Sequence, residues 1–290
     1  MTTTTATSRE LGRGLAVSTH GLVHIYRSEG HDVAALAGVD LDVRAGEIVG
    51  LLGPSGAGKS TLLTLFGGLM RPSAGRIRVG GHDLGTMDEA SLDGYRAGDV
   101  GLVLQGAARN LVPYLTPSEN VAFAQSSARA AGRPVPTPAE VLELVGIVGR
   151  ARSSLASLSP AELQLTALGV AIGTWPGLLL ADEPTSQLDH EARDLVLEAL
   201  RGINRQVGTT IVIVTHDAEV AARLPRTVTI RDGRVGGEGR RGEAYSVVSA
   251  DGSLPLPQDV LDAFPPGALV RVHPEGGSWT LLPPEEELDA

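Results

Sequence analysis

Residues 53–61 have the types and spacing that most clearly indicate chemistry. They read Gly-Pro-Ser-Gly-Ala-Gly-Lys-Ser-Thr and match the pattern G-x-x-x-x-G-K-[ST]. An apolar run, Glu47–Leu52, precedes them, and a helix-type segment, Gly58–Met70, follows. Glycines allow backbone N–H groups to turn toward phosphate oxygens, and the start of a helix adds its positive dipole end. The pattern predicts a phosphate-binding loop. A Gly-rich turn with a chance lysine is the alternative, which the flanking strand and helix disfavour.

Within the loop, Lys59 is placed to reach the β- and γ-phosphates of a nucleotide and to assist their chemistry, and the Ser60 hydroxyl is placed to ligate Mg²⁺. The residues of the loop that we expect to bind nucleotide are Gly53, Ser55, Gly56, Gly58, Lys59, Ser60 and Thr61.

Two carboxylates follow another apolar run, Leu178–Ala181. We expect Asp182 to hold Mg²⁺, directly or through water, and Glu183 to polarise an attacking water. Strands that end in exposed acids are common. The position of this one, a domain-sized interval after the phosphate-binding loop, favours a role in phosphoryl transfer.

Two further polar residues end apolar runs. His216 follows Thr210–Val214, and Gln105 follows Val100–Leu104. Open α/β sheets bind ligands at the carboxyl edge of their strands, so His216 is expected to contact the γ-phosphate, although a lone histidine is more often structural or merely exposed. Gln105 indicates little by itself.

Elements of two kinds must position these residues. The four apolar runs read as buried strands, and helix-period segments lie between them at Thr137–Val148, Pro160–Gly173 and His190–Val207. Alternation of strands with helices predicts an α/β fold with a mostly parallel core sheet.

The order of these motifs resembles that of the ABC-transporter ATPases, P-loop proteins, over residues 15–236. The resemblance implies ATP and Mg²⁺ as cofactors, a helical subdomain at about 106–176, and a role for Gln105 in both metal binding and catalysis. It also implies that Tyr26 stacks on adenine and that Asp189, in the Ser-Gln-Leu-Asp segment, contributes to nucleotide binding at a dimer interface.

One segment departs from that family. Its signature, Leu-Ser-Gly-Gly-Gln, lies opposite the partner's phosphate-binding loop, whereas residues 158–162 here read Leu-Ser-Pro-Ala-Glu. Ser159 can still bind phosphate, but Pro160 has no N–H, Ala161 adds a Cβ, and Glu162 adds negative charge. We expect either slow hydrolysis, hydrolysis in a heterodimer with an intact partner, or ordinary activity, because proline is tolerated in a first helical turn.

Residues 32–39 and 110–121 resemble segments of the lipoprotein-release and macrolide-exporter ATPases. That resemblance implies a separate integral-membrane permease as partner, docking near the segment between Gln105 and Val121. It also implies a second ATPase subunit, with a homodimer favoured over a heterodimer, and a cytoplasmic location on the inner face of the cell membrane. The alternative is a soluble regulatory switch protein of the same ATPase class with weak activity.

The composition limits the partners. The net charge is −10, which disfavours nucleic acid, and there is no cysteine and hence no disulfide or thiolate metal site. No apolar run approaches the roughly 18 to 20 residues needed to span a bilayer. Residues 1–14 are expected to be a disordered lead without the features of a signal peptide.

The chain changes character after residue 236. We expect a flexible linker over 237–243, a small β-rich domain over 244–284 and an acidic end over 285–290. The predicted order in the domain is strand, Asp-Gly turn, strand over 244–257, a helix over Gln258–Phe264, and strands at Ala268–His273 and Ser278–Leu282.

This order resembles the AbrB/MazE swapped-hairpin domain, which forms its core from two chains. Since the tail has one arginine, Arg271, among several acids, we expect a dimerisation clamp and not DNA binding. An appendage that packs on its own ATPase domain is the alternative.

Overall fold

The computed structural model describes residues 14–28, 31–240, 243–248 and 252–283. The predictions for residues 1–13 and 285–290 therefore lie outside the described residues. Within the described part, no helix combines the length and apolar character needed to cross a membrane.

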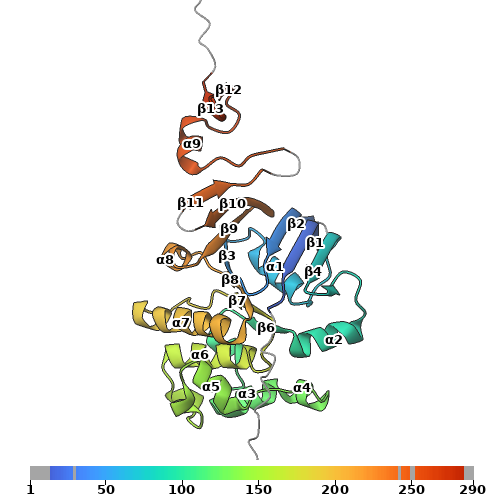
Figure 1. Ribbon diagram of the computed structural model, residues 1–290, viewed down its shortest axis with the longest axis vertical. Helices are drawn as coiled ribbons and strands as arrows, with labels where there is room; N and C mark the ends of the chain where they lie inside the picture. The colour runs from blue at the N-terminus through green and yellow to red at the C-terminus, as the bar shows by residue number, and fades with distance from the viewer. Residues whose placement is uncertain (1–13, 29–30, 241–242, 249–251, 284–290) are drawn as a thin grey trace, which may run out of the picture.

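A seven-stranded sheet forms the centre of the molecule, in the order β11-β10-β9-β3-β8-β7-β6 (Figure 1). The five strands from β9 to β6 run parallel, and β10 and β11 are antiparallel additions at one edge. The four predicted strands are confirmed as β3 (Ile48–Leu52), β6 (Val100–Val103), β7 (Leu178–Asp182) and β8 (Thr210–Val214). The α/β class with a mostly parallel core is thus confirmed.

Both faces of the central strands β3, β7 and β8 are buried. Along β7, Leu178 and Leu180 face one hydrophobic cluster, and Leu179 and Ala181 face the other. Side chains of a strand alternate between faces, so burial on both sides requires an uninterrupted apolar run. This is why the central strands could be recognised in the sequence.

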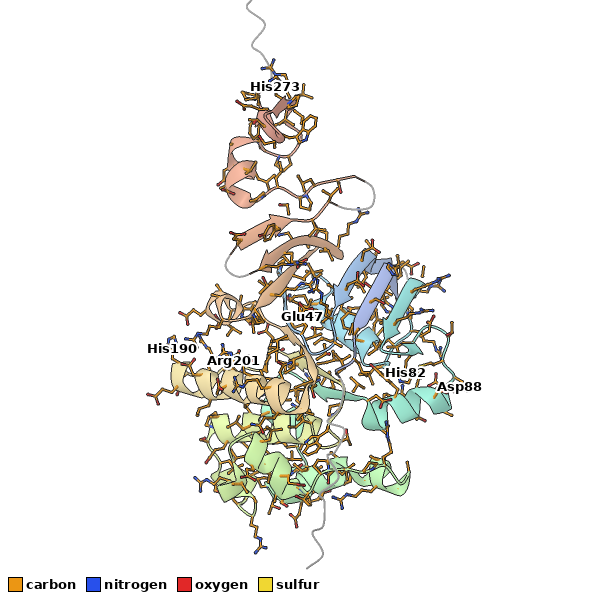
Figure 2. All side chains as sticks on the ribbon, in the orientation of Figure 1. Glu47, His82, Asp88, His190, Arg201 and His273 are labelled. Carbon is orange, nitrogen blue, oxygen red and sulfur yellow. The ribbon has the colours of Figure 1, made fainter. Side chains whose placement is uncertain are left out.

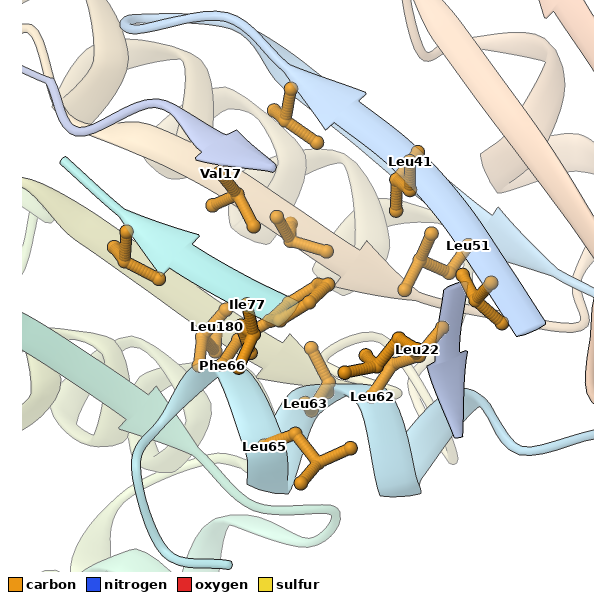
Figure 3. Close-up of a cluster of buried hydrophobic side chains, with 14 of the residues drawn as sticks. Val17, Leu22, Leu41, Leu51, Leu62, Leu63, Leu65, Phe66, Ile77 and Leu180 are labelled. Atoms are coloured by element: carbon orange, nitrogen blue, oxygen red, sulfur yellow. The ribbon is translucent and has the colours of Figure 1, made fainter. Parts of the chain in front are cut away.

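The first cluster lies between the central sheet and a smaller antiparallel sheet of order β2-β1-β4-β5. Its strands are β1 (Val17–Ser28), β2 (His31–Val43), β4 (Ala74–Val79) and β5 (His82–Asp83). Helix α1 (Lys59–Phe66) crosses this cluster and buries Leu62, Leu63, Leu65 and Phe66 (Figure 3). The core thereby fixes the helix that follows the phosphate-binding loop.

Helices cover the other face. Helix α7 (His190–Val207) and the group α3 (Pro117–Ala124), α4 (Ser126–Ala130), α5 (Pro138–Leu144) and α6 (Pro160–Ala171) lie on that side (Figure 1). Short 3₁₀ turns, Ala107–Asn110, Val148–Arg150 and Leu155–Ser157, join them. Helix α2 (Glu89–Gly98) packs beside β6, and α8 (Ala218–Ala222) follows β8.

Residues 237–240, predicted as part of a flexible linker, are strand. They belong to β10 (Arg234–Arg240), which pairs with β9 (Arg226–Arg231) and β11 (Glu243–Ser246). The glycines permit close strand approach, because a Cβ at Gly239 would lie 2.4 Å from Thr227 Oγ1. Residues 241–242 lie outside the described part.

The tail differs from the predicted order in its first half. The strand at Glu243–Ser246 pairs with β10 and extends the central sheet, and residues 254–257 are not strand. Asp251 of the predicted Asp-Gly turn lies outside the described residues. The second half agrees, with α9 at Gln258–Ala263, β12 at Arg271–Glu275 and β13 at Ser278–Leu282. Figure 1 shows this half projecting beyond the sheet edge.

Candidate functional site

The phosphate-binding loop has a backbone that other residues could not adopt. Gly53, Gly56 and Gly58 have φ angles of +138°, +80° and +99°. A Cβ at Gly53 would lie 2.0 Å from the carbonyl oxygen of Ile230, and one at Gly58 would lie 2.4 Å from that of Ala35. Positive φ and close backbone approach both require glycine here, so the sequence pattern and the geometry agree.

Lys59 is the first residue of α1 and is only 8% exposed. Its Nζ donates to the carbonyl oxygens of Gly53 at 2.8 Å and Pro54 at 2.7 Å. The ammonium is thus held against the loop itself. A phosphate bound by the loop would meet this charge directly.

A cleft of about 640 Å³ gathers most of the predicted site residues at the carboxyl edge of the parallel strands. The phosphate-binding loop forms one wall, with Tyr26 and residues 33–35 beside it. The predicted site residues that line this cleft are Tyr26, Gly53, Ser55, Gly56, Gly58, Lys59, Ser60, Thr61, Gln105, Asp182, Glu183 and His216. Ser159 and Asp189 do not line it.

Glu183 and His216 form a pair at the end of two neighbouring strands. His216 Nδ1 lies 2.6 Å from Glu183 Oε1, and the backbone N–H of Glu183 donates to the carbonyl oxygen of Val214 at 2.9 Å. Glu183 has φ of +48°, an unfavourable value for a residue with a side chain. Such backbone strain concentrates at functional sites, which supports the assignment of Glu183 to catalysis.

The metal ligands expected from the sequence fit Mg²⁺. Ser60, Gln105 and Asp182 line the same cleft and supply only one carboxylate. The described residues contain no group of three or more His, Cys, Asp or Glu side chains that could hold a metal by themselves. Magnesium usually binds through one or two carboxylates together with substrate phosphates, so this donor set suits a metal that arrives with ATP.

Tyr26 borders the cleft from β1. Its hydroxyl lies 3.2 Å from Thr61 Oγ1, and its ring meets that of His24 edge to face at 4.8 Å. These contacts fix the orientation of an aromatic ring that is 42% exposed. An oriented and accessible ring is what stacking on a base requires.

Ser159 and Asp189 act as helix caps within this chain. Ser159 Oγ accepts from the N–H of Glu162 at 3.2 Å, and Asp189 Oδ1 accepts from the N–H of Ala192 at 2.8 Å. Their predicted roles in nucleotide binding require a second subunit.

Asn110 was not identified as a site residue from the sequence. Its Oδ1 accepts from the N–H of Leu104 at 2.8 Å, and its Nδ2 donates to the carbonyl oxygens of Leu104 and Gly106 at 2.9 and 3.0 Å. It thereby holds the backbone on both sides of Gln105. The available signal was an asparagine shortly after a strand end, a residue type that often hydrogen-bonds to nearby backbone.

Comparison with known proteins identifies the family of the chain. The profile of the ABC transporter family matches residues 36–186. The lipoprotein-releasing system ATP-binding protein LolD of Anaeromyxobacter dehalogenans is 43% identical over 208 residues, covering 70% of this chain and 85% of that protein. The methionine import ATP-binding protein MetN of Caulobacter vibrioides is 40% identical over 231 residues, covering 78% of this chain and 67% of that protein. Among solved structures, the dimeric ATP-binding cassette MJ0796 bound to ADP and Pi is 30% identical with a TM-score of 0.68, covering 77% of this chain and 98% of that one.

The chain belongs to the ABC transporter family. It is an ATP-binding, ATP-hydrolysing subunit of the kind that works with a membrane permease, as the sequence motifs predicted.

Proposed function

We propose that two copies of this chain bind two Mg·ATP molecules between them and drive one separate permease on the inner face of the membrane. The observation that carries the proposal is the cleft that joins Lys59, Asp182, Glu183 and His216 at one sheet edge. Similarity to the ATP-binding proteins of lipoprotein-releasing systems supports a role in lipoprotein release or a related process. ATP-driven pairing and hydrolysis-driven opening of the two ATPase subunits would drive the permease.

In this proposal each residue has a defined task. The loop N–H groups and Lys59 neutralise the β- and γ-phosphates, and Ser60, Gln105 and Asp182 hold Mg²⁺. The metal supplies positive charge to the oxygens of the transferred phosphoryl group. Glu183 orients and deprotonates the attacking water. His216, paired with Glu183 at 2.6 Å, holds that carboxylate in place and faces the γ-phosphate.

The altered signature segment supports slow hydrolysis. At the start of α6, the Glu162 carboxylate accepts from the N–H of Ser159 at 2.8 Å and from Arg150 Nε at 2.7 Å. These contacts hold the pKa of Glu162 below its usual value, the bond from the Ser159 N–H contributing most. A negative charge therefore lies at the helix start where an incoming phosphate would bind, and the two repel each other.

The same local structure begins two neighbouring helices. Capping boxes with proline in the first turn start α3 at Thr116 and α5 at Thr137, as well as α6 at Ser159. The sequence Thr-Pro-Ala-Glu at 137–140 is nearly identical to Ser-Pro-Ala-Glu at 159–162. In this chain the signature position therefore has the structure of an ordinary helix start, which is stable without a phosphate.

The tail is proposed to join two copies. Strands β12 and β13 pair only with each other among the described residues, and Leu269 and Trp279 are 78% and 71% exposed. A lone two-stranded hairpin is marginally stable in water. The tail of a second copy, arranged as in the AbrB/MazE domain, would cover these side chains and favour a homodimer.

A permease is proposed to dock beside Gln105. Tyr114 and Phe123 are 85% and 62% exposed and lie on the segment that begins at the 3₁₀ turn Ala107–Asn110 and continues through α3. Exposed aromatic side chains are typical of interaction surfaces.

The test is to purify tagged Glu183→Gln protein from native membranes with ATP and Mg²⁺, with Tyr114→Ser as a docking variant. We expect a multi-span permease in stoichiometric amount, and its loss in the Tyr114→Ser protein. An intact ATPase dimer without any membrane protein would contradict the proposal and favour the soluble switch.

A further inference from the structure

One arginine joins the start of α7 to the segment that follows His216. Arg193 Nη1 donates to Glu219 Oε2 at 2.6 Å, and Arg193 Nη2 lies 3.3 Å from Asp217 Oδ2. The Arg193 side chain is only 14% exposed. Ion pairs that are partly withdrawn from water are screened less than surface pairs, so this contact holds the two helix starts together.

Asp217 connects the Arg193 ion pair to the backbone that positions His216 against Glu183. Its Oδ1 accepts from two N–H groups in the first turn of α8, at 2.8 and 3.3 Å, and its own N–H donates to Thr215 Oγ1 at 3.1 Å. The backbone on both sides of His216 is therefore fixed. The orientation of His216 against Glu183 depends on this fixed backbone, because only two torsion angles, χ1 and χ2, separate the imidazole ring from the backbone.

The other end of the connection lies at the start of α7. Asp189 caps this helix, and the N–H of Arg193 donates to the carbonyl oxygen of Asp189 at 2.9 Å. Figure 2 shows His190 at the same helix end, and its Nδ1 lies 3.5 Å from Glu219 Oε2. The first turn of α7 is thus bound to the residues that follow His216.

Arg193 has a feature that a purely structural ion pair does not explain. Its Nε is buried and has no hydrogen-bond partner among the described residues. An unsatisfied buried donor costs stability. The two terminal nitrogens of the same guanidinium nevertheless both face carboxylates, which indicates a role in placing these two partners.

We propose that Arg193 is a positioning residue for ATP hydrolysis. It holds Asp217, and through it sets His216 against Glu183. It also ties this pair to the start of α7, next to residues 186–189. That last link rests on the proposed function, a pair of subunits, and on the family resemblance, which implies that residues 186–189 lie at the interface of that pair. Contacts made at residues 186–189 when two subunits pair would then affect the position of the catalytic base Glu183 in the same chain, and the Arg193 guanidinium would connect the two.

The test compares Arg193→Met with Arg193→Lys and with Arg201→Met as a matched control. Arg201 lies on the same helix (Figure 2) and pairs with Glu198 at 3.6 Å, and neither residue lines the cleft. We expect Arg193→Met to lower kcat by about ten- to a hundredfold, with the Kd for ATP within about twofold. Arg193→Lys should recover part of the loss, and Arg201→Met should match the parental protein.

A second variant, Asp217→Asn, keeps a good helix cap but removes the charge that Arg193 binds. It should lower kcat in the same way, and the double variant should be no slower than Arg193→Met alone. If Arg193→Met does not fold, Asp217→Asn carries the kinetic test by itself. A parental value of kcat in the folded variants, or an equal loss of ATP affinity, would overturn the proposal.

A measurement without turnover separates this proposal from the proposed function. The ¹⁵N imidazole signals of His216, assigned with His216→Gln, report its hydrogen bond to Glu183. We expect Arg193→Met and Asp217→Asn to shift these signals and Arg201→Met to leave them unchanged. Unshifted signals in these two variants would overturn the positioning role of Arg193, whether or not the parental protein hydrolyses ATP. Absence of ATP hydrolysis by the parental protein would contradict the proposed function but not the positioning role.

Discussion

Restoring the family signature at the start of α6 is expected to accelerate hydrolysis. The variant is Pro160→Gly, Ala161→Gly and Glu162→Gln. It adds a backbone N–H at position 160, removes the Cβ at 161, and removes the negative charge that now accepts from the Ser159 N–H at 2.8 Å. All three changes favour a phosphate at this helix start.

The size of the effect follows from these contacts. A hydrogen bond to a charged group contributes about 1.5–3 kcal/mol, so one new bond made in the transition state raises kcat by about ten- to a hundredfold. The same changes lower the free energy of unfolding by about 2 kcal/mol, because glycine replaces alanine and proline in a helix turn. Steady-state ATPase assays and chemical denaturation measure the two effects.

Helix α5 provides the matched control. Pro138→Gly, Ala139→Gly and Glu140→Gln make the same changes in the same kind of capping box, away from the nucleotide cleft. This variant should lose similar stability without any gain in kcat. If the α6 variant turns over no faster than the α5 variant, the proposal that the altered signature slows hydrolysis is wrong.

Three further predictions concern ATP binding, pH and the tail. Lys59→Ala should raise the Kd for ATP by about 10- to 150-fold in calorimetry, because it removes a charged donor to phosphate. Partial burial acts to raise the pKa of Glu238, but hydrogen bonds from Arg226 and Arg240 outweigh it and leave the pKa below its usual value. Glu238→Gln should therefore cost about 1–2 kcal/mol of stability at pH 7. The difference in free energy of unfolding between the two proteins should disappear as the pH falls below the usual pKa range of a glutamate and through the lowered pKa of Glu238. Urea denaturation at a series of pH values measures this difference. Deleting residues 247–290 leaves β11 in place and should weaken the nucleotide-free dimer at least tenfold in sedimentation; an unchanged dimer constant would remove the clamp proposal.

The sequence predicted the elements whose pattern is local and missed those whose pattern is interrupted. β7 and β8 are continuous apolar runs because both faces are buried. β1 was missed although it has 12 residues, because the register shifts between Thr19 and Leu22, around Gly21 at φ of +55°, break the alternation of side chains. The pairing of Glu243–Ser246 with β10 depends on the edge of a sheet formed by distant residues, which no local pattern records.

The site shows the same division. The phosphate-binding loop, Asp182, Glu183 and His216 follow strands directly, so their convergence could be predicted from the parallel order. The roles of Asn110 and Arg193 depend on contacts with backbone and carboxylates that only the folded chain brings near. The sequence predicted a departure from the family at Pro160, and the structure adds that Glu162 and Arg150 complete an ordinary helix cap there.

Sedimentation velocity of Glu183→Gln protein, with and without Mg·ATP, tests the central claim most directly. Removing the base while keeping the side-chain shape should leave ATP bound and unhydrolysed between two subunits. We predict that the Glu183→Gln protein forms a dimer with Mg·ATP and that this dimer persists over hours. The Lys59→Ala, Glu183→Gln double variant should form no such dimer. Hydrolysis at the parental rate, or a sedimentation coefficient that does not respond to Mg·ATP, would contradict it.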